Sequence, residues 1–256
     1  MLTYISAKHA QALRECGLHT FEQVWQHPIA WFEAPNESRG GWSGVGRLQL
    51  ELPSGGTLCL FVKKQQNHGR LTSLHPIKGE PTFRREYQRL QYLEARGIAA
   101  PQVVFYAEQL IENQACAILV TEELSGYASL ESLAESLFIK RNFTRGQKQQ
   151  LFKVIASSLH SFHQLGLVHR ALYPKHIFVK DAETHPQVAL IDLEKARFTP
   201  LFWYRAYYDL ASLNRHAEHW QRADCLYLFM QYCQIKRLGT LSKWLCRQII
   251  KRSQRK

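Results

Sequence analysis

The chain has 256 residues, enough to bury a large core as one domain or as two lobes. Its composition, 45% hydrophobic and 21% charged, is ordinary for a soluble globular protein, and we expect neither a signal peptide nor a membrane span, because no run of about 18 apolar residues occurs. The formal charge of +12, from 33 Lys and Arg against 21 Asp and Glu, favours anionic partners such as nucleotides, nucleic acid, anionic lipid or phosphorylated glycans.

The first part of the chain is predicted to form a helix followed by a small sheet. A helix is expected over residues 6–32, because Phe21, Val24 and Trp25 fall at helical spacing, and a turn at 35–41 should end it. Alternating residues then predict a β-hairpin, followed by one inserted helix and two more strands. These elements are the hairpin strands 47–52 and 57–62 around a turn at 53–56, the helix 82–95, and the strands 102–106 and 115–121.

The second part of the chain is predicted to be mainly helical. A long helix is expected over 146–165, two short strands over 176–179 and 187–191, and helices from residue 204 onward. A strand-rich half followed by a helix-rich half predicts an α+β fold of two lobes, with the default small-ligand site in the cleft between them. The expected domains are a helical N-terminal extension (1–39), a strand-rich lobe (40–122) and a helix-rich lobe with a basic C-terminal helix (123–256).

The last 23 residues form a basic segment with its own pattern. Residues 234–256 contain eight basic residues and no acidic one, and their apolar residues fall near helical spacing. Such a helix could lie on an anionic membrane surface, or it could pack on the domain with a solvated basic face. The apolar residues are Leu241, Trp244, Leu245, Ile249 and Ile250. We expect no nucleic-acid binding, because no stacking platform or recognised motif accompanies the charge.

The six cysteines form no C-x-x-C pair and no regular spacing. Reduced thiols in a cytoplasmic protein, packed as small apolar groups, are therefore expected. His160 and His163 lie one helical turn apart, but no third ligand follows at a suitable spacing, so we interpret them as ordinary helix residues.

The segment Val-His-Arg-Ala-Leu-Tyr-Pro-Lys-His at 168–176 carries the strongest motif. It fits the protein-kinase pattern H-R-D-L-x-x-x-N, and Leu-Ile-Asp-Leu-Glu at 190–194 fits the D-F-G that follows. Pro174 matches a common form of the loop and secures the register. Ala171 therefore stands in place of the catalytic Asp, and His176 in place of the magnesium-binding Asn. The motif predicts a protein-kinase-like fold with a β-rich N-lobe and an α-helical C-lobe.

Asp192 is the best candidate metal ligand. It follows an apolar strand, where a carboxylate can hold Mg²⁺ between phosphates, although an Asp at a strand end can also simply cap a turn. His176 could bind metal through a ring nitrogen, hydrogen-bond Asp192 or fill the site, since imidazole is a softer ligand than Mg²⁺ prefers. His169 is expected to support the loop. A substitute base would have to come from Lys175, His176 or Glu194, and Asp209 is expected to brace the loop.

The first half supplies candidates for binding the phosphates. Lys63 follows Leu-Phe-Val in a strand, as the Lys of V-A-I-K does, and Glu86 on the next helix could form the ion pair that holds it. The alternatives are a solvated Lys at a strand end and a surface Glu. Alternation places Lys64 on the opposite face of the strand. The remaining nucleotide-binding candidates are Gly41, Gly44 and Gly46, in a glycine-rich segment that could close over phosphates or be a flexible turn, and Glu122, where the strand-rich half ends.

As a set, these motifs resemble the lipopolysaccharide core kinases of Gram-negative bacteria, the Kdo/WaaP-type family, and within it the InaA branch. The resemblance covers about residues 21–213. The segments that carry it are 39–45 (RGGWSGV), 61–65 (FVKKQ), 85–87 (REY), 172–178 (LYPKHIF), 190–197 (LIDLEKAR) and 208–210 (YDL).

The resemblance implies a cytoplasmic kinase-like protein working near the inner membrane, with ATP as donor, Mg²⁺ as its metal and a sugar hydroxyl of the lipopolysaccharide inner core as acceptor. His176 is similar to the family's pattern, whereas Ala171 departs from catalytic members, which keep an Asp. The leading hypothesis is therefore an ATP-dependent kinase of the lipopolysaccharide core, slowed by the missing base. The alternative is a pseudokinase, a nucleotide-binding scaffold for a partner kinase. Residues 234–256 could contact the anionic inner membrane peripherally.

Overall fold

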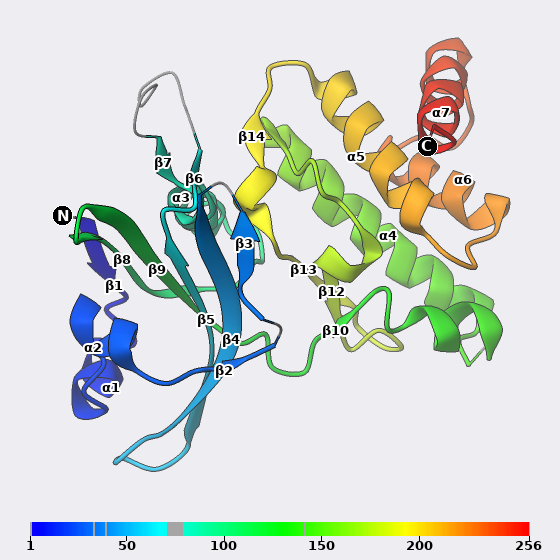
Figure 1. Cartoon of the computed structure of the whole chain (residues 1–256). Helices are drawn as coiled ribbons and strands as arrows, with labels where there is room; N and C mark the ends of the chain where they lie inside the picture. The colour runs from blue at the N-terminus through cyan, green and yellow to red at the C-terminus, as the bar shows by residue number, and fades with distance from the viewer. Residues whose placement is uncertain (1, 33, 39, 71–78, 141, 256) are drawn as a thin grey trace. The chain divides into compact units, whose positions relative to one another are not determined.

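The computed structural model describes residues 2–32, 34–38, 40–70, 79–140 and 142–255, which separate into two compact units (Figure 1). Unit 1 comprises Met1–Glu94 and Pro101–Leu124, and unit 2 comprises Ala95–Ala100 and Ser125–Lys256. Within the described ranges, no helix is long and apolar enough to cross a membrane. Arg39, the first residue of the family motif, lies outside the described residues.

Unit 1 is built around a seven-stranded sheet with the order β1-β8-β9-β5-β4-β2, in which β3 also pairs with β4. Every pairing in this sheet is antiparallel. The strands are β1 (Leu2–Ile5), β2 (Ala30–Trp31), β3 (Asn36–Ser38), β4 (Gly41–Glu51), β5 (Thr57–Gln66), β8 (Val103–Ile111) and β9 (Gln114–Glu122). The other elements are helices α1 (Ala10–Glu15), α2 (Phe21–Gln26) and α3 (Thr82–Glu94) and a small ladder of β6 (Gly69–Arg70) with β7 (Glu80–Pro81). The predicted hairpin, inserted helix and two following strands are all present, and the strands are longer than expected.

The single helix predicted over residues 6–32 is wrong. The segment forms two short helices, α1 and α2, and ends in strand β2. Gly17 stops α1, because its φ of +66° is left-handed, a conformation that residues with a Cβ rarely adopt. Thr20 then starts α2 through a capping box with Gln23, in which each side chain satisfies the other's backbone N–H. The apolar face of both helices packs into the unit 1 core, which includes Leu13, Phe21 and Val24.

The glycine-rich segment is not a flexible turn, which was one of its two interpretations, and its proposed contact with phosphates stays a prediction. From Gly41 onward it lies inside β4, paired with β5 on one edge and with β3 and β2 on the other. The turn of the hairpin is where predicted, with Gly55 and Gly56 at φ of +91° and +90°. The expected break at 35–41 contains the short strand β3.

Unit 2 is mainly helical, as predicted. Its long helix α4 (Arg145–Gln164) starts at a capping box between Thr144 and Gln147. Leu151, Ile155 and Leu159 repeat at helical spacing along its buried face and are fully inaccessible. The other helices are α5 (Phe202–His216), α6 (Arg222–Tyr232), α7 (Thr240–Ser253) and the short turns η1 (Glu135–Ile139), η2 (Pro174–His176) and η3 (Leu193–Lys195). The strands are β10 (Ala128–Ser129), β11 (Leu167–Val168), β12 (Ile177–Lys180), β13 (Gln187–Leu190) and β14 (Arg197–Phe198).

The basic C-terminal segment forms α7, which packs against α5 (Figure 1). Its own residues Leu245 and Ile249 are buried, so the inner face of α7 is an ordinary packed helix face. Leu241, Trp244 and Ile250 remain 58%, 55% and 45% exposed. One helix therefore carries both an inner packed face and an outer face that combines apolar and basic residues.

Candidate active site

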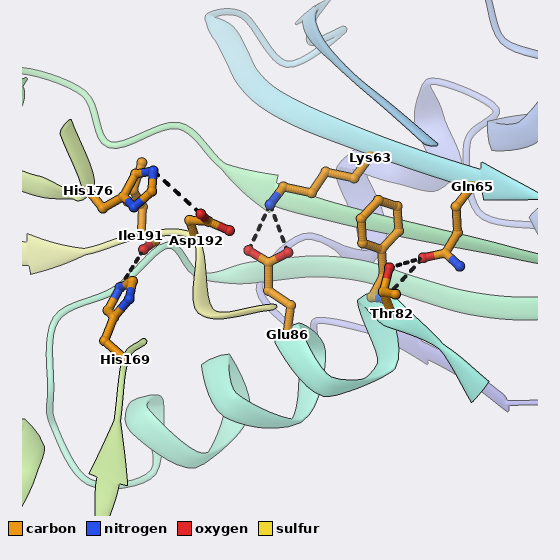
Figure 2. A network of polar contacts seen from close by, with 9 residues as sticks. Lys63, Gln65, Thr82, Glu86, His169, His176, Ile191 and Asp192 are labelled. Atoms are coloured by element: carbon orange, nitrogen blue, oxygen red, sulfur yellow. Dashed lines mark hydrogen bonds and ion pairs between the residues drawn. The ribbon is translucent and has the colours of Figure 1, made fainter. Parts of the chain in front are cut away.

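Strand β5 holds the first cluster of candidate residues. It lies inside the unit 1 sheet, with Lys63 opposite Val45 of β4 and Leu119 of β9. The Lys63 ammonium donates to both carboxylate oxygens of Glu86 at 2.7 Å each (Figure 2). The Glu86 side chain is only 4% exposed and that of Lys63 19% exposed, so the pair is largely desolvated. The structure thus brings together the two residues that the sequence proposed as partners.

Gln65 positions this pair, a role that no sequence motif indicates. It is two residues along β5 from Lys63, so it lies on the same face of the sheet, and it is completely buried. Its amide oxygen accepts from Thr82 Oγ1 at 2.9 Å and from the backbone N–H of Phe83 at 3.1 Å (Figure 2). Its amide nitrogen donates to the His68 carbonyl at 2.7 Å. Gln65 therefore ties the start of α3 to β5 one turn before Glu86. Alternation along the strand could have placed Gln65 on the same face as Lys63, but it could not have given the partners of Gln65.

Lys64 lies on the opposite face of β5, as alternation predicted. Its ammonium donates to the carbonyls of Trp25 at 2.8 Å and His27 at 2.9 Å, at the end of α2. It is 4% exposed, and burial lowers the pKa of Lys64 to about 8. The role of Lys64 is to hold α2 on the sheet, so it is distinct from the role proposed for Lys63.

The three glycine candidates are explained by close packing. A Cβ on Gly44 would lie 2.9 Å from the Trp31 ring, and one on Gly46 would lie 2.6 Å from the Ala30 carbonyl. A Cβ on Gly41 would collide with the backbone of Gln66. Because strand neighbours already require the absence of a side chain at each position, these glycines are not in themselves a signal for phosphate binding.

Glu122 has partners within unit 1. Its carboxylate accepts from the Lys8 ammonium at 2.7 Å and lies 3.1 Å from Nε2 of His9. His9 is 4% exposed, and burial is the main cause that lowers its pKa. The N-terminal segment therefore holds the end of β9, and the proposed nucleotide contact of Glu122 stays a prediction.

The loop that resembles H-R-D is fixed from below by Asp209 of α5. The fully buried Asp209 carboxylate accepts from the backbone N–H of His169 at 2.6 Å and of Arg170 at 2.8 Å. Its Oδ2 lies 3.0 Å from Nε2 of His163, whose Nδ1 lies 2.6 Å from the Tyr232 hydroxyl. Nε2 of His163 therefore donates to the carboxylate and the Tyr232 hydroxyl donates to Nδ1. The expectation that Asp209 braces the loop is confirmed.

His160 and His163 do not form a metal pair. His160 Nδ1 lies 2.9 Å from the Tyr232 carbonyl, whereas His163 faces Asp209. Across the described residues, no group of three or more His, Cys, Asp or Glu side chains could by itself hold a metal ion. Both histidines therefore serve the packing of α4, as the sequence interpretation expected.

The second cluster lies at the end of β13 in unit 2. Asp192 has φ +58° and ψ +60°, the left-handed conformation, and its side chain is 35% exposed. Its Oδ2 lies 3.4 Å from Nε2 of His176 (Figure 2). Nδ1 of His176 lies 2.7 Å from the Ala171 carbonyl. The pKa of His176 is lowered, and burial is the largest cause of this shift. The structure thus brings His176 and Asp192 together, as one of the alternatives for His176 proposed.

His169 supports this cluster without reaching into it. Its Nε2 lies 2.9 Å from the Ile191 carbonyl, and its ring stacks on that of His176 at 6.0 Å between centroids. His169 is fully buried, which fits the supporting role given to it by the sequence. Ala171 is also fully buried, and its methyl group cannot accept a proton. Of the candidates for a substitute base, Lys175 is exposed and Glu194 is partly exposed.

Comparisons with known proteins extend over nearly the whole chain. The structure is similar to a solved structure described as WaaP in complex with acyl carrier protein, with a TM-score of 0.68 and 22% identity, covering 98% of this chain and 99% of that one. This likeness confirms the predicted kinase-like α+β fold. The chain is also 28% identical over 204 residues to the protein InaA of Escherichia coli (strain K12), which covers 80% of this chain and 91% of InaA. Residues 22–232 match the family model described as the lipopolysaccharide kinase (Kdo/WaaP) family, and the chain therefore belongs to this family.

Proposed function

We propose that the protein is an ATP-dependent phosphotransferase that acts on a sugar hydroxyl of the lipopolysaccharide inner core. The observation that carries the proposal is the Lys63–Glu86 ion pair, with both carboxylate oxygens at 2.7 Å from the ammonium, in a chain of this family. Phosphoryl transfer depends mainly on positioning and on charge stabilisation of the phosphates. Lys63 would bind the α- and β-phosphates, and Glu86 and Gln65 would keep Lys63 in place.

Asp192 and His176 would hold the divalent cation that accompanies the nucleotide, for which the family resemblance implies Mg²⁺. The donor set fits a cation, because the Asp192 carboxylate is partly exposed and the facing nitrogen of His176 can offer a lone pair. A bound cation would neutralise charge on the phosphates. The two side chains would orient it, and His169 would keep the His176 ring in place.

The missing Asp at position 171 sets the expected rate. General base assistance contributes about 10²- to 10⁴-fold in typical enzymes, so an enzyme with Ala171 should be slow rather than inert. The basic surface, at +12 for the chain, supports an acceptor that carries phosphates or carboxylates.

The test is transfer of labelled γ-phosphate from ATP to lipopolysaccharide purified from a strain that lacks this protein. Wild-type protein should label the glycan, and Asp192→Ala should abolish the label. Lys153→Ala, at an exposed position on α4, serves as a surface control and should retain the transfer. Absence of label above the Asp192→Ala background, with the acceptor verified as intact, would refute the proposal.

A pseudokinase is the second candidate, and the buried methyl group of Ala171 favours it. In that case the only roles of Lys63, Glu86 and Asp192 would be to bind nucleotide and to maintain the shape of the protein. Ala171→Asp distinguishes the two functions, because a restored carboxylate should accelerate a slow kinase and should leave a scaffold without transfer. Nucleotide binding by the variant, measured in parallel, verifies that it is folded.

Peripheral contact with the anionic inner membrane is proposed for α7. Lys243, Arg247 and Lys251 are exposed at four-residue intervals, which places them on one helix face, beside the exposed Trp244. Arg247→Glu should weaken binding to vesicles that contain phosphatidylglycerol, whereas Lys153→Glu, an exposed charge reversal on α4, should leave it unchanged. Equal binding by the two variants would refute the contact.

An acyl carrier protein is proposed as a partner, because the WaaP neighbour of the same fold was solved in complex with one. Unit 2 contains an apolar cavity of about 730 Å³ between α5, α6 and α7, with Leu213, Phe229 and Ile249 in its wall. Ile250→Glu, at this wall, should reduce co-elution with acylated carrier protein. Leu241→Glu on the same helix lies outside the wall and should not.

A further inference from the structure

The tautomer of His176 is determined by its neighbour. Nδ1 lies 2.7 Å from the carbonyl oxygen of Ala171, and a carbonyl oxygen can only accept a hydrogen bond. Nδ1 must therefore carry the proton. In the neutral ring, Nε2 then bears a lone pair, and this nitrogen is the one that faces Asp192.

The contact between His176 and Asp192 brings two electron-pair donors together. Nε2 and Oδ2 lie 3.4 Å apart, which is longer than the usual 2.7–3.2 Å of a good N–H···O hydrogen bond. Two ligands of one cation typically lie about 3 Å apart, since metal–ligand distances are about 2.0–2.2 Å. The separation thus suits two groups that share a cation.

The surroundings of His176 are those of a metal-ligating histidine. Such residues almost always donate their second ring N–H to a carbonyl, a carboxylate or water, which sets the tautomer and the ring orientation. The Ala171 carbonyl has this role, and the plane of the stacked His169 ring is tilted 15° from parallel to that of His176. This support is independent of the Asp192 contact and points to the same nitrogen.

We propose that this site takes a first-row transition-metal cation such as Mn²⁺ in preference to Mg²⁺. The inference rests on the proposed function, whose phosphates would supply further oxygen ligands. Mg²⁺ prefers an all-oxygen octahedral shell, whereas imidazole nitrogen suits transition-metal ions. A protein-kinase Asn at position 176 would offer oxygen, so His176 changes the donor from hard to borderline. Within the described residues only two protein ligands meet here, so binding should be tight only with a nucleotide present.

The test measures cation binding directly, with Mn²⁺ as the probe and a non-hydrolysable ATP analogue present. Paramagnetic resonance of bound Mn²⁺ should show coupling to a directly bound nitrogen, and a large excess of Mg²⁺ should be needed to displace the ion. His176→Asn should remove the nitrogen coupling and lower the preference for Mn²⁺ over Mg²⁺, because it replaces the imidazole nitrogen by an amide oxygen. His185→Gln, at an exposed histidine in the β12–β13 turn, is the matched control and should leave both readouts unchanged.

Several outcomes would overturn the inference. These are equal affinity of wild-type protein for Mn²⁺ and Mg²⁺, absence of nitrogen coupling, or an unchanged preference in His176→Asn. His176→Gln replaces the Asn variant if that variant fails to fold. Nitrogen coupling without phosphate transfer to lipopolysaccharide would retain the cation site and refute the proposed function. Phosphate transfer that Mn²⁺ and Mg²⁺ support equally would retain the proposed function and refute the preference of the site for Mn²⁺.

Discussion

The Lys63–Glu86 pair allows a sharp prediction about stability and binding together. Glu86→Gln retains the shape of the side chain and removes its charge, so the Lys63 ammonium stays largely buried without its carboxylate. Breaking a buried pair costs about 3–5 kcal/mol, and the lower end of the range applies because Lys63 is 19% exposed. At about 2–4 °C per kcal/mol for chains of this size, the melting temperature should fall by roughly 6–12 °C.

The paired replacement Lys63→Met with Glu86→Leu separates stability from function. Apolar residues of similar volume in place of a buried ion pair are often neutral or stabilising, so the double variant should regain the stability lost in Glu86→Gln. It should still fail to bind nucleotide. Hydrogen exchange in peptides from β5 and α3 would localise both effects to unit 1. A Glu86→Gln variant that melts with the wild type would refute the reasoning, as would a double variant no more stable than the single one.

Three further predictions concern the supports around the two clusters. Asp209→Ala should lower the free energy of unfolding in urea by about 3 kcal/mol or more, because it removes the acceptor of two buried donors and one part-buried donor at about 1–3 kcal/mol each. Amide hydrogen exchange should rise in residues 167–176, and a rise confined to other segments would contradict this. Gly46→Ala should destabilise the ligand-free protein by about 1–3 kcal/mol, because the added Cβ would collide with Ala30. Gly146→Ala, on the open surface of α4, is the control and should stabilise the protein by up to about 1 kcal/mol. Equal effects of the two substitutions would show that packing does not explain Gly46. Burial lowers the pKa of Lys64 to about 8 in the folded state, so the folded protein releases this proton at a lower pH than the unfolded chain does. In urea titrations, the free energy of unfolding of the wild type relative to Lys64→Met should therefore be constant below pH 8 and rise above it. A difference that falls above pH 8 would contradict this reasoning.

Local periodicity predicted most of the fold. The hairpin, α3, α4 and strands β8, β9, β12 and β13 all lie where alternation or helical spacing placed them. The N-terminal segment was mistaken for one helix because the apolar residues of α1 and α2 remain in phase across Gly17 and Thr20. Only the left-handed glycine and the capping box separate them, and both are short-range signals. Strands β1, β2 and β3 were missed because two to four residues carry too little periodicity.

The sequence predicted those pairs of the candidate site whose residues belong to recognisable motifs. Lys63 with Glu86, and His176 with Asp192, meet as their order along the chain indicated. The proposed phosphate contacts of the glycines stay a prediction, because a glycine needed for strand packing and one needed for a phosphate look the same in a sequence. Gln65 was missed because a buried amide reveals its role only through its partners, Thr82 and Phe83, which are seventeen and eighteen residues away.

Three consecutive residues of β5 hold two helices at three different points. Lys63 contacts α3 through Glu86, Lys64 holds the end of α2, and Gln65 holds the start of α3. The neighbouring lysines are therefore not spare copies of each other. Bringing Lys64 to the place of Lys63 would require a one-residue slip of the strand, which would turn Gln65 towards the core and release both helices. In a genetic selection for function, a strain that carries a mutated Lys63 should consequently recover only by restoring a basic residue at that codon, with no suppressors at its neighbour.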